Sequence, residues 1–381
     1  MSQKFYRGID LNNTAIELVV EDDMITAVRP IAADSSLPWL LPSLVDLQHN
    51  GALEIAYNNL AENAPAQLRQ VAEHLIRNGI GRCLATFTTC PYERLNTAAK
   101  AFDQALCADK ILEALFPGIF HEGVFISPKA GWRGGHDPAY ILPPDWEKFS
   151  RLQELADGRI RLVNIAPEEP GALDFIRKAH AAGIKVALGH CCPDTATIAA
   201  AVKAGASMVT HFGNGSSPEI HRFHNPFWGF LDQAGLALGL VGDGFHLPPE
   251  LVRVALRCKG IDNCFMVSDA NIYSGCVPGT YQRIGGLDCV IEKNGYIHVV
   301  GQEILAGAWY QNNRSVEFLV NQVGLNFLDA WKLCSTIPAK LIDIELPQLQ
   351  PGDEATFVQA RFDKQTLHIE QSVFCGKNHL D

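Results

Sequence analysis

No stretch of the 381 residues approaches the ~20 uninterrupted apolar residues that a membrane-spanning helix needs. Positive charge is also scarce, because 31 Lys and Arg residues stand against 42 Asp and Glu residues and leave a formal net charge of -11. A chain with this balance is unsuited to non-specific binding of nucleic acid or of an anionic membrane surface. Hydrophobic residues make up 47% of the sequence, which is enough for a buried core and excludes general disorder.

The cysteines form neither a zinc-binding nor a disulfide pattern. There are 11 of them, an odd number, and no two stand in a CxxC pair of the kind found in structural zinc sites. Residues 1–9 carry Lys4 and Arg7 without an apolar run behind them, so we predict no signal peptide. These features together predict a cytoplasmic protein with reduced thiols.

The central part of the chain alternates between short apolar runs and segments with helical spacing. This alternation predicts a parallel sheet, and eight repeats of it predict an α/β fold with a closed (β/α)8 barrel of the TIM type. Gly183 and Gly205 stand just after two helical segments, where helices commonly end. The predicted strands are 44–47, 83–88, 118–120, 160–165, 185–188, 208–210, 236–241 and 264–267, and the predicted helices include 66–78, 172–182, 195–204, 249–258, 313–323 and 328–335.

The two ends of the chain have a different character. Residues 16–31 hold two apolar runs separated by a turn at 21–23, and residues 352–374 hold two similar runs. Two β-rich termini around a long alternating middle predict a small β-sandwich domain built from both ends. We place this domain at 1–41 and 346–381, and the hydrolase barrel at 42–345.

Polar residues capable of chemistry follow the predicted barrel strands at their C-terminal ends. Active sites of (β/α)8 barrels form at this end of the strands. The residues are Asp46, Gln48, Asn50, Glu122, His190, His211, His246 and Asp269.

Three of these residues make a typical metal-binding set. Glu122, His190 and His211 provide one carboxylate and two imidazoles, a common combination in catalytic zinc sites. A single histidine at a strand end is more often structural, but three candidates on one predicted face favour a metal site. Asp269 could then exchange protons with a water molecule beside the metal, although an Asp in this position can also cap the segment that follows it.

A loop of small residues, 213–217, follows His211 and contains Asn214 and Gly215. Loops of this kind can turn backbone N–H groups toward an anion, and Arg222 and His246 could add positive charge. On the residues alone, an ordinary Gly/Ser loop with a solvated arginine is the simpler interpretation.

Seven short blocks of the sequence resemble, in the same order, the N-acetylglucosamine-6-phosphate deacetylase family of the amidohydrolase superfamily. The resemblance runs from about residue 41 to residue 344, which is most of the chain. Each block is weak alone, and their shared order carries the resemblance. The blocks are PSLVDLQHNG at 42–51, HEGVFISP at 121–128, LGH at 188–190, THFGN at 210–214, GDGFH at 242–246, SDA at 268–270 and LAG at 305–307.

This resemblance implies roles for individual residues. Glu122, His190 and His211 would bind the metal, and Asp269 would act as general base and general acid. His136 would lie near the scissile carbonyl and help to polarise it. A homodimer is also implied, because in family members the arginine at the position of Arg222 can reach across the dimer interface. The residues that would hold the sugar phosphate are Asn214, Gly215, Arg222 and His246.

The first strand bears on the number of metal ions. Many members of the superfamily carry an H-x-H pair there that binds a second metal, whereas Gln48 and Asn50 occupy those positions here. A branch of the deacetylases has the same Q-x-N, so the resemblance implies one divalent ion, with zinc the first candidate and iron or another divalent ion the alternative. His49 would point to the opposite side of the strand.

The chain also departs from the family pattern. Phe120 stands where the family usually has a histidine, Trp132 and Arg133 look inserted before His136, and residues 309–311 (Trp-Tyr-Gln) replace the S/L-T-M positions after L-A-G. The metal and proton-transfer residues are retained, but the walls of the substrate pocket are changed.

We predict a metal-dependent hydrolase that removes the N-acetyl group from an N-acetylhexosamine 6-phosphate, with N-acetylglucosamine 6-phosphate as the first candidate. An amidohydrolase acting on another N-acyl or cyclic amide substrate is the alternative. A third reading is an inactive barrel that senses a sugar phosphate. Asp269 argues against it, because a protein that only binds has no need of a proton carrier.

Overall fold

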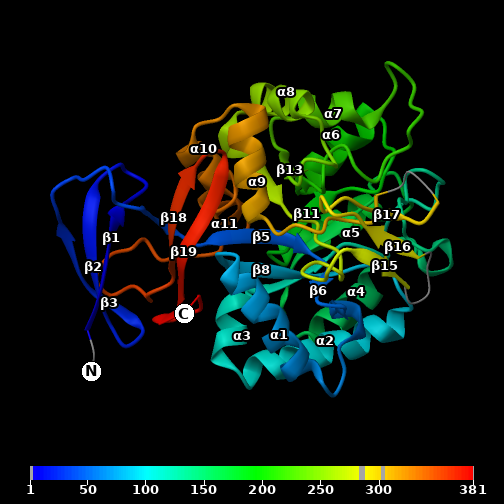
Figure 1. Cartoon of the computed structure of the whole chain (residues 1–381). Coiled ribbons are helices and arrows are strands. Elements are labelled where there is room, and N and C mark those ends of the chain that lie inside the picture. The colour runs from blue at the N-terminus through cyan, green and yellow to red at the C-terminus, as the bar shows by residue number, and fades with distance from the viewer. Residues whose placement is uncertain (1–2, 283–287, 302–304, 381) are drawn as a thin grey trace.

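The computed structural model describes residues 3–282, 288–301 and 305–380 and contains two principal sheets (Figure 1). Eight parallel strands form the barrel, in the spatial order β14-β13-β12-β11-β10-β9-β8-β5. The predicted (β/α)8 barrel is therefore confirmed. Its strands are β5 (Leu44–His49), β8 (Ile80–Phe87), β9 (Gly118–His121), β10 (Ile160–Ile165), β11 (Lys185–Leu188), β12 (Ala206–Val209), β13 (Ala237–Val241) and β14 (Cys264–Val267).

The first and last strands close the barrel through hydrogen bonds at their C-terminal ends. The backbone N–H of Asp269 donates to the carbonyl oxygen of Gln48 at 2.9 Å. The N–H of Ser268 donates to Oδ1 of Asp46 at 3.1 Å. This closure places residues from opposite ends of the barrel sequence side by side.

Helices surround the barrel because each one carries an apolar stripe on a single face. In α1 (Ala64–Arg77), the buried residues Leu68, Val71, Ala72 and Leu75 recur at helical spacing. The remaining helices are α2 (Tyr92–Cys107), α3 (Lys110–Leu115), α4 (Trp146–Leu155), α5 (Ala172–Ala181), α6 (Thr195–Ala204), α7 (Pro226–Asp232), α8 (Pro249–Lys259), α9 (Asn313–Phe318), α10 (Phe327–Leu333) and α11 (Thr336–Leu341), with a π-helical turn at Leu319–Val323 and 3-10 turns at Tyr57–Asn59, Pro138–Tyr140 and Ile261–Asn263.

The helix ends expected at two glycines are present. Gly183 and Gly205 follow α5 and α6 with φ angles of 76° and 121°. Glycine adopts this region at low cost because it has no Cβ. Asp194 caps the start of α6 by accepting a hydrogen bond from the N–H of Thr197 at 2.8 Å.

The two chain ends form the predicted additional β unit, as one hydrogen-bonded sheet in the order β20-β19-β18-β4-β1-β2-β3. A single register pair, Ile9 with Trp39, joins the N-terminal hairpin to β4. In Figure 1, β1 to β3 lie apart from the barrel, and β18 and β19 lie between them and the barrel helices. These strands are β1 (Gln3–Ile9), β2 (Ala15–Glu21), β3 (Met24–Pro30), β4 (Trp39–Pro42), β18 (Phe357–Asp363), β19 (Thr366–Phe374) and β20 (Lys377–Asn378).

This terminal sheet has a hydrophobic cluster of its own, which includes Leu18, Leu40 and a Tyr6–Phe357 ring pair with centroids 4.9 Å apart. The domain limits at 41/42 and 345/346 remain predictions, and residues 1–2 and 381 of the proposed terminal domain lie outside the described residues. Within the described part of the chain, no helix has the length and apolar character needed to cross a membrane.

Two small sheets lie near the barrel mouth and were not predicted. One has three short antiparallel strands and follows β14 in the chain. Their brevity explains why the sequence pattern does not reveal them, since three residues are too few to show alternation. The strands are β15 (Gly279–Tyr281), β16 (Cys289–Ile291) and β17 (Ile297–Val299), and the second small sheet pairs β6 (Gly51–Ala52) with β7 (Ile55–Ala56).

Candidate active site

Three of the predicted site residues have an unusual backbone. His190, His211 and Asp269 follow β11, β12 and β14 and have positive φ angles of 49°, 28° and 49°. A non-glycine residue held in this region costs about 1–3 kcal/mol, and such strain concentrates at functional sites. The three strand ends therefore adopt a costly conformation that turns these side chains into the barrel mouth.

The carboxylate of Glu122 and the imidazoles of His190 and His211 converge on one point. Oε1 of Glu122 lies 3.0 Å from Nε2 of His211 and 3.4 Å from Nε2 of His190. The two Nε2 atoms are themselves 3.0 Å apart. All three residues are buried, so the structure brings together the three side chains that the sequence suggested as metal ligands.

His136 joins this cluster. Its Nε2 lies 3.2 Å from Nε2 of His190, and its Nδ1 lies 2.7 Å from Oγ1 of Thr89. The potential ligand atoms of Glu122, His136 and His190 lie within 4.8 Å of one another. His136 therefore lies close enough to act as a ligand, in addition to its suggested role beside the scissile carbonyl.

The cluster suits a metal ion because its imidazole nitrogens face each other across short distances. The carbonyl oxygen of Trp132 lies 3.3 Å from Nδ1 of His190. A carbonyl can only accept, so Nδ1 of His190 carries the proton and Nε2 presents its lone pair to the cluster. One carboxylate oxygen and several such nitrogens are a ligand set for zinc, iron or another divalent ion.

Charge balance within the cluster follows from these contacts. Burial alone would raise the pKa of Glu122, but hydrogen bonds with His190 and His211 outweigh it, and the pKa is lowered. Burial alone would lower the pKa of His211, but the hydrogen bond and charge of Glu122 raise it. The site therefore keeps Glu122 ionised even though it is buried.

Asp269 is held beside the cluster by two amides from the first strand. Its Oδ1 accepts hydrogen bonds from Nδ2 of Asn50 at 2.9 Å and from Nε2 of Gln48 at 3.2 Å. Nε2 of Gln48 also donates to Oε1 of Glu122 at 2.7 Å. Burial raises the pKa of Asp269, and the negative charge of Glu122 raises it further.

Gln48 and Asn50 thus donate hydrogen bonds to the two carboxylates. The side chain of Gln48 connects Asp269 to Glu122, and the side chain of Asn50 donates to Asp269. A raised pKa suits a carboxyl group that must both take up and release a proton near neutral pH.

The small-residue loop contacts the cluster through Gly215. Its φ angle is 57°, and a Cβ at this position would lie 2.5 Å from Nδ1 of His190. Any larger residue would displace that imidazole or the loop. Asn214 lies next to it, and its buried Nδ2 has no hydrogen-bond partner among the described residues, so it can donate to a ligand.

His246 is held by Asp243 rather than by the cluster. Its Nδ1 lies 2.8 Å from Oδ2 of Asp243. Burial alone would lower the pKa of His246, but the hydrogen bond and charge of Asp243 raise it. The imidazole is therefore a favourable binding group for an anion.

Arg222 lies elsewhere. It is exposed on the segment between β12 and α7, and its guanidinium carbon lies 5.4 Å from the ring centroid of Phe223. Within the part of this single chain that is described, no hydrogen bond or ion pair connects its side chain with the cluster. Of the predicted site residues, it is the one that the fold of one chain leaves on the surface.

Three supporting residues were missed from the sequence: Thr89, Trp132 and Asp243. Thr89 and Trp132 contact His136 and His190, and Asp243 contacts His246. Two of them could have been identified from the sequence, because Trp132 belongs to the inserted segment and Asp243 belongs to the GDGFH block. No sequence pattern indicated Thr89, because its contact with His136 depends on how the end of β8 packs against the loop that contains His136.

His121, which precedes Glu122, takes no part in the site. It is fully buried, and its ring centroid lies 5.5 Å from that of Phe125 and 5.8 Å from that of Phe149. Burial lowers its pKa to about 4. Phe120 occupies the position, two residues before Glu122, where the family usually has a histidine. The neighbouring His121 does not take over the role of that histidine.

Comparison with known proteins agrees with the geometry. No protein-family model matches the chain. An N-acetylgalactosamine-6-phosphate deacetylase of Escherichia coli O157:H7 is 26% identical over 360 residues, covering 93% of this chain and 92% of that protein. An N-acetylglucosamine-6-phosphate deacetylase of Bacillus subtilis is 28% identical over 308 residues, covering 80% and 76%.

The predicted resemblance to the amino-sugar phosphate deacetylases is confirmed. Solved structures show the same fold. An N-acetyl-D-glucosamine-6-phosphate deacetylase mutant of Mycobacterium smegmatis, in complex with N-acetyl-D-glucosamine-6-phosphate, has a TM-score of 0.86 at 22% identity and covers 100% of both chains. The N-acetylglucosamine-6-phosphate deacetylase of Pasteurella multocida has a TM-score of 0.84 at 24% identity, covering 98% of this chain and 99% of that one.

Proposed function

We propose that this protein is a metal-dependent hydrolase that removes the N-acetyl group from an N-acetylhexosamine 6-phosphate, giving acetate and an amino sugar phosphate. The observation that carries the proposal is the convergence of Glu122, His190, His211 and His136 beside Asp269, with contacts of 3.0 to 3.4 Å between neighbouring ligand atoms. Curated relatives that cover most of the chain are deacetylases of such sugar phosphates.

The ligands that we propose for the ion are Glu122, His190 and His211, with His136 near enough to act as a further ligand or to polarise the substrate carbonyl. A divalent ion held there would polarise the amide carbonyl and lower the pKa of water toward ~7. Zinc is the first candidate, and iron is the alternative.

Asp269 performs the proton transfers. It takes a proton from the attacking water, whose oxygen forms a bond to the acetyl carbon. The bond between that carbon and the amide nitrogen then breaks, and Asp269 gives the proton to the departing nitrogen. Gln48 and Asn50 hold the carboxylate in place through their amide N–H groups.

We further propose that Asn214, Gly215 and His246 bind the sugar phosphate together with Arg222 of a second copy of the chain. Arg222 is accompanied on the surface by two apolar side chains, Phe223, which is 70% exposed, and Trp228, which is 55% exposed. Exposed apolar side chains grouped in this way favour an interface. The proposal therefore includes a homodimer. We also propose that the protein is cytoplasmic.

Two substrates deserve direct comparison, because one relative acts on the galactose epimer and others act on the glucose epimer, according to their names. The decisive measurement is acetate release from N-acetylglucosamine and N-acetylgalactosamine, each with and without the 6-phosphate, using protein of known metal content. We expect release from at least one phosphorylated sugar and at most slow release from the others.

Failure to release acetate from either phosphorylated sugar by metal-loaded protein would refute the proposal. Activity on another N-acyl or cyclic amide compound would then support the alternative amidohydrolase. Sedimentation or light scattering tests the dimer, and Arg222→Ala should raise KM for the phosphorylated sugar alone.

A further inference from the structure

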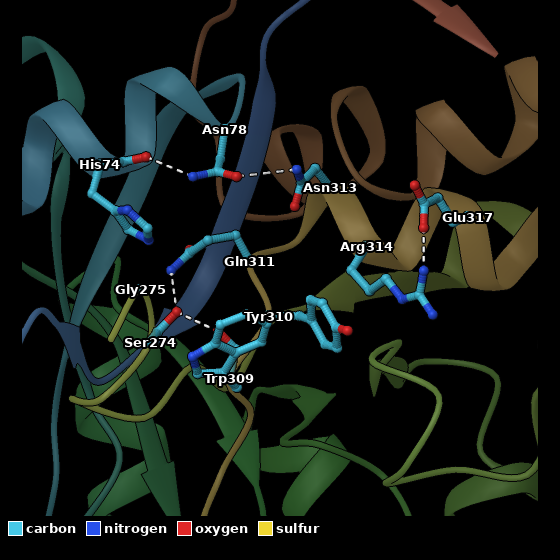
Figure 2. Close-up of a pocket in the computed structure, with 10 residues that line it drawn as sticks. All are labelled: His74, Asn78, Ser274, Gly275, Trp309, Tyr310, Gln311, Asn313, Arg314 and Glu317. Atoms are coloured by element: carbon cyan, nitrogen blue, oxygen red, sulfur yellow. Dashed lines mark hydrogen bonds and ion pairs between the residues drawn. The ribbon is translucent and has the colours of Figure 1, made fainter. Parts of the chain in front are cut away.

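A cavity separate from the metal cluster lies outside the barrel wall. Figure 2 shows it between α1, the segment after β14 and the start of α9. Its volume is about 310 Å³, within the usual size range of small-molecule sites. None of the residues that line it belongs to the proposed metal site.

Gln311 lines this cavity, and its side chain is only 5% exposed. Its Nε2 donates to Oγ of Ser274 at 2.8 Å and lies 3.3 Å from Nε2 of His49. Both amide hydrogens are therefore in use, and the amide orientation is determined by these two contacts. The remaining atom, Oε1, is buried and has no hydrogen-bond partner among the described residues.

Two further groups on the same wall are also unsatisfied. Nε2 of His74 and Nε of Arg314 are buried without a hydrogen-bond partner in the described part of the chain. Buried polar atoms are nearly always hydrogen-bonded, so each exception calls for an explanation. Three such atoms around one cavity are open hydrogen-bonding positions that a bound molecule could fill.

The charges of the cavity indicate what kind of ligand fits. Arg314 forms an ion pair with Glu317 through Nη1, so its positive charge is already balanced. Burial lowers the pKa of His74, which favours its neutral form. No net charge therefore remains on these groups to bind an anion.

The open hydrogen-bonding positions have mixed polarity. Oε1 of Gln311 can only accept, the N–H of Arg314 can only donate, and Nε2 of His74 can do either according to its tautomer. Hydroxyl groups match such a mixture because each one both donates and accepts. The rings of Trp309 and Tyr310, which form another part of the wall (Figure 2), can pack against C–H groups.

We propose that this cavity binds an uncharged polyhydroxylated molecule of about monosaccharide size. Trp309, Tyr310 and Gln311 are the three positions at which the chain departs from the pattern after the LAG block, so the wall is a feature of this sequence. The inference does not depend on the proposed deacetylase activity.

The test is a binding measurement by isothermal titration or saturation-transfer NMR on the full-length protein. The probes are glucose, N-acetylglucosamine and myo-inositol, with glucose 6-phosphate as the anionic comparison. We expect saturable binding of at least one uncharged probe, stronger than that of the anionic one. No saturable binding of any uncharged probe, or tighter binding of the phosphate, overturns the proposal.

Variants locate the binding. Gln311→Met removes the open acceptor, and Asn313→Phe places a large ring in the cavity; each should weaken binding at least tenfold. Asn321→Phe is the matched control, because Asn321 is exposed in the adjoining π-helical turn and does not line the cavity. If Gln311→Met fails to fold, the affinity of Asn313→Phe still tests whether the ligand binds in this cavity. Unchanged affinity in the folded variants refutes the assignment.

Discussion

Two buried imidazoles of the barrel, one in its mouth and one outside its first strand, respond to burial in opposite ways. In the barrel mouth, His211 follows β12 and lies 3.0 Å from the Glu122 carboxylate, and its pKa is raised despite burial. Outside the first strand, the ring of His49 lies beside uncharged groups in the described part of the chain, the hydroxyl of Tyr57 at 2.9 Å and the amide of Gln311 at 3.3 Å. Burial, with a smaller contribution from His74, lowers its pKa to about 3. Both rings are buried, so the charge of the nearest partner makes the difference.

The contrast distinguishes side chains in the barrel mouth, which we assign to catalysis, from side chains outside the barrel, which contribute to packing. The inner groups carry charges that a metal and a substrate can use, and their strained backbone keeps them in place. The outer groups form an uncharged network, in which the amide of Gln311 donates to His49 Nε2, so that Nδ1 of His49 must donate to Tyr57. We expect changes on the inner face to affect turnover and metal binding, and changes on the outer face to affect stability.

The largest effect is expected for Asp269→Asn. The amide keeps the size of the side chain but cannot carry the proton, and general acid–base catalysis contributes about 10²–10⁴-fold to the rate. We therefore expect kcat to fall by about that factor while metal content, measured by atomic absorption, stays constant. Full activity in this variant would contradict the proton-transfer role.

Gly215→Ala should weaken metal binding by about 10- to 100-fold, the usual effect of disturbing a residue that orients a ligand. The added Cβ would lie 2.5 Å from Nδ1 of His190. Gly183→Ala is the control, because Gly183 also has a positive φ angle, 76°, but nothing within 4 Å of its added Cβ. Metal titration should separate the two variants, and equal affinities would show that Gly215 does not position His190.

The pH dependence of KM should reveal the Asp243–His246 pair. Since Asp243 raises the pKa of His246, the cation is present at low pH and is lost as pH rises through that raised pKa. KM for a phosphorylated substrate should then increase by about tenfold, as expected for losing one hydrogen bond to a charged group. In Asp243→Asn this increase should begin at lower pH, and an unshifted profile would exclude the pair from phosphate binding.

The smallest effects concern stability on the outer faces of the strands. His49→Phe leaves the Gln311 amide and the Tyr57 hydroxyl short of a partner, which should cost about 1–3 kcal/mol. His121→Phe should cost much less, because neither ring nitrogen of His121 hydrogen-bonds to another described residue. Urea denaturation of both variants provides the measurement, and equal losses would show that the His49 network adds no stability.

Much of the fold could be predicted from the sequence because barrel strands are buried and read as apolar runs. The runs at Ile160–Ile165, Lys185–Leu188 and Cys264–Val267 have the predicted bounds. The positions of Gly183 and Gly205 also followed from local chemistry, since few other residues adopt their φ angles easily. The three short strands after β14 were missed because their pairing depends on contacts between segments rather than on a local pattern.

For the site, the sequence indicated the residue types and the strand ends, because the alternation of strands and helices assigns each polar residue to one face of the barrel. Only the tertiary structure decided that His136 joins His190 at 3.2 Å, that the Trp132 carbonyl orients His190, and that Arg222 stays on the surface. These relations join loops far apart in the chain, and no local preference of the backbone encodes such distances. The alternation of side chains along a strand determines which side of the strand a residue faces. Closure of the barrel determines which other residues it contacts there.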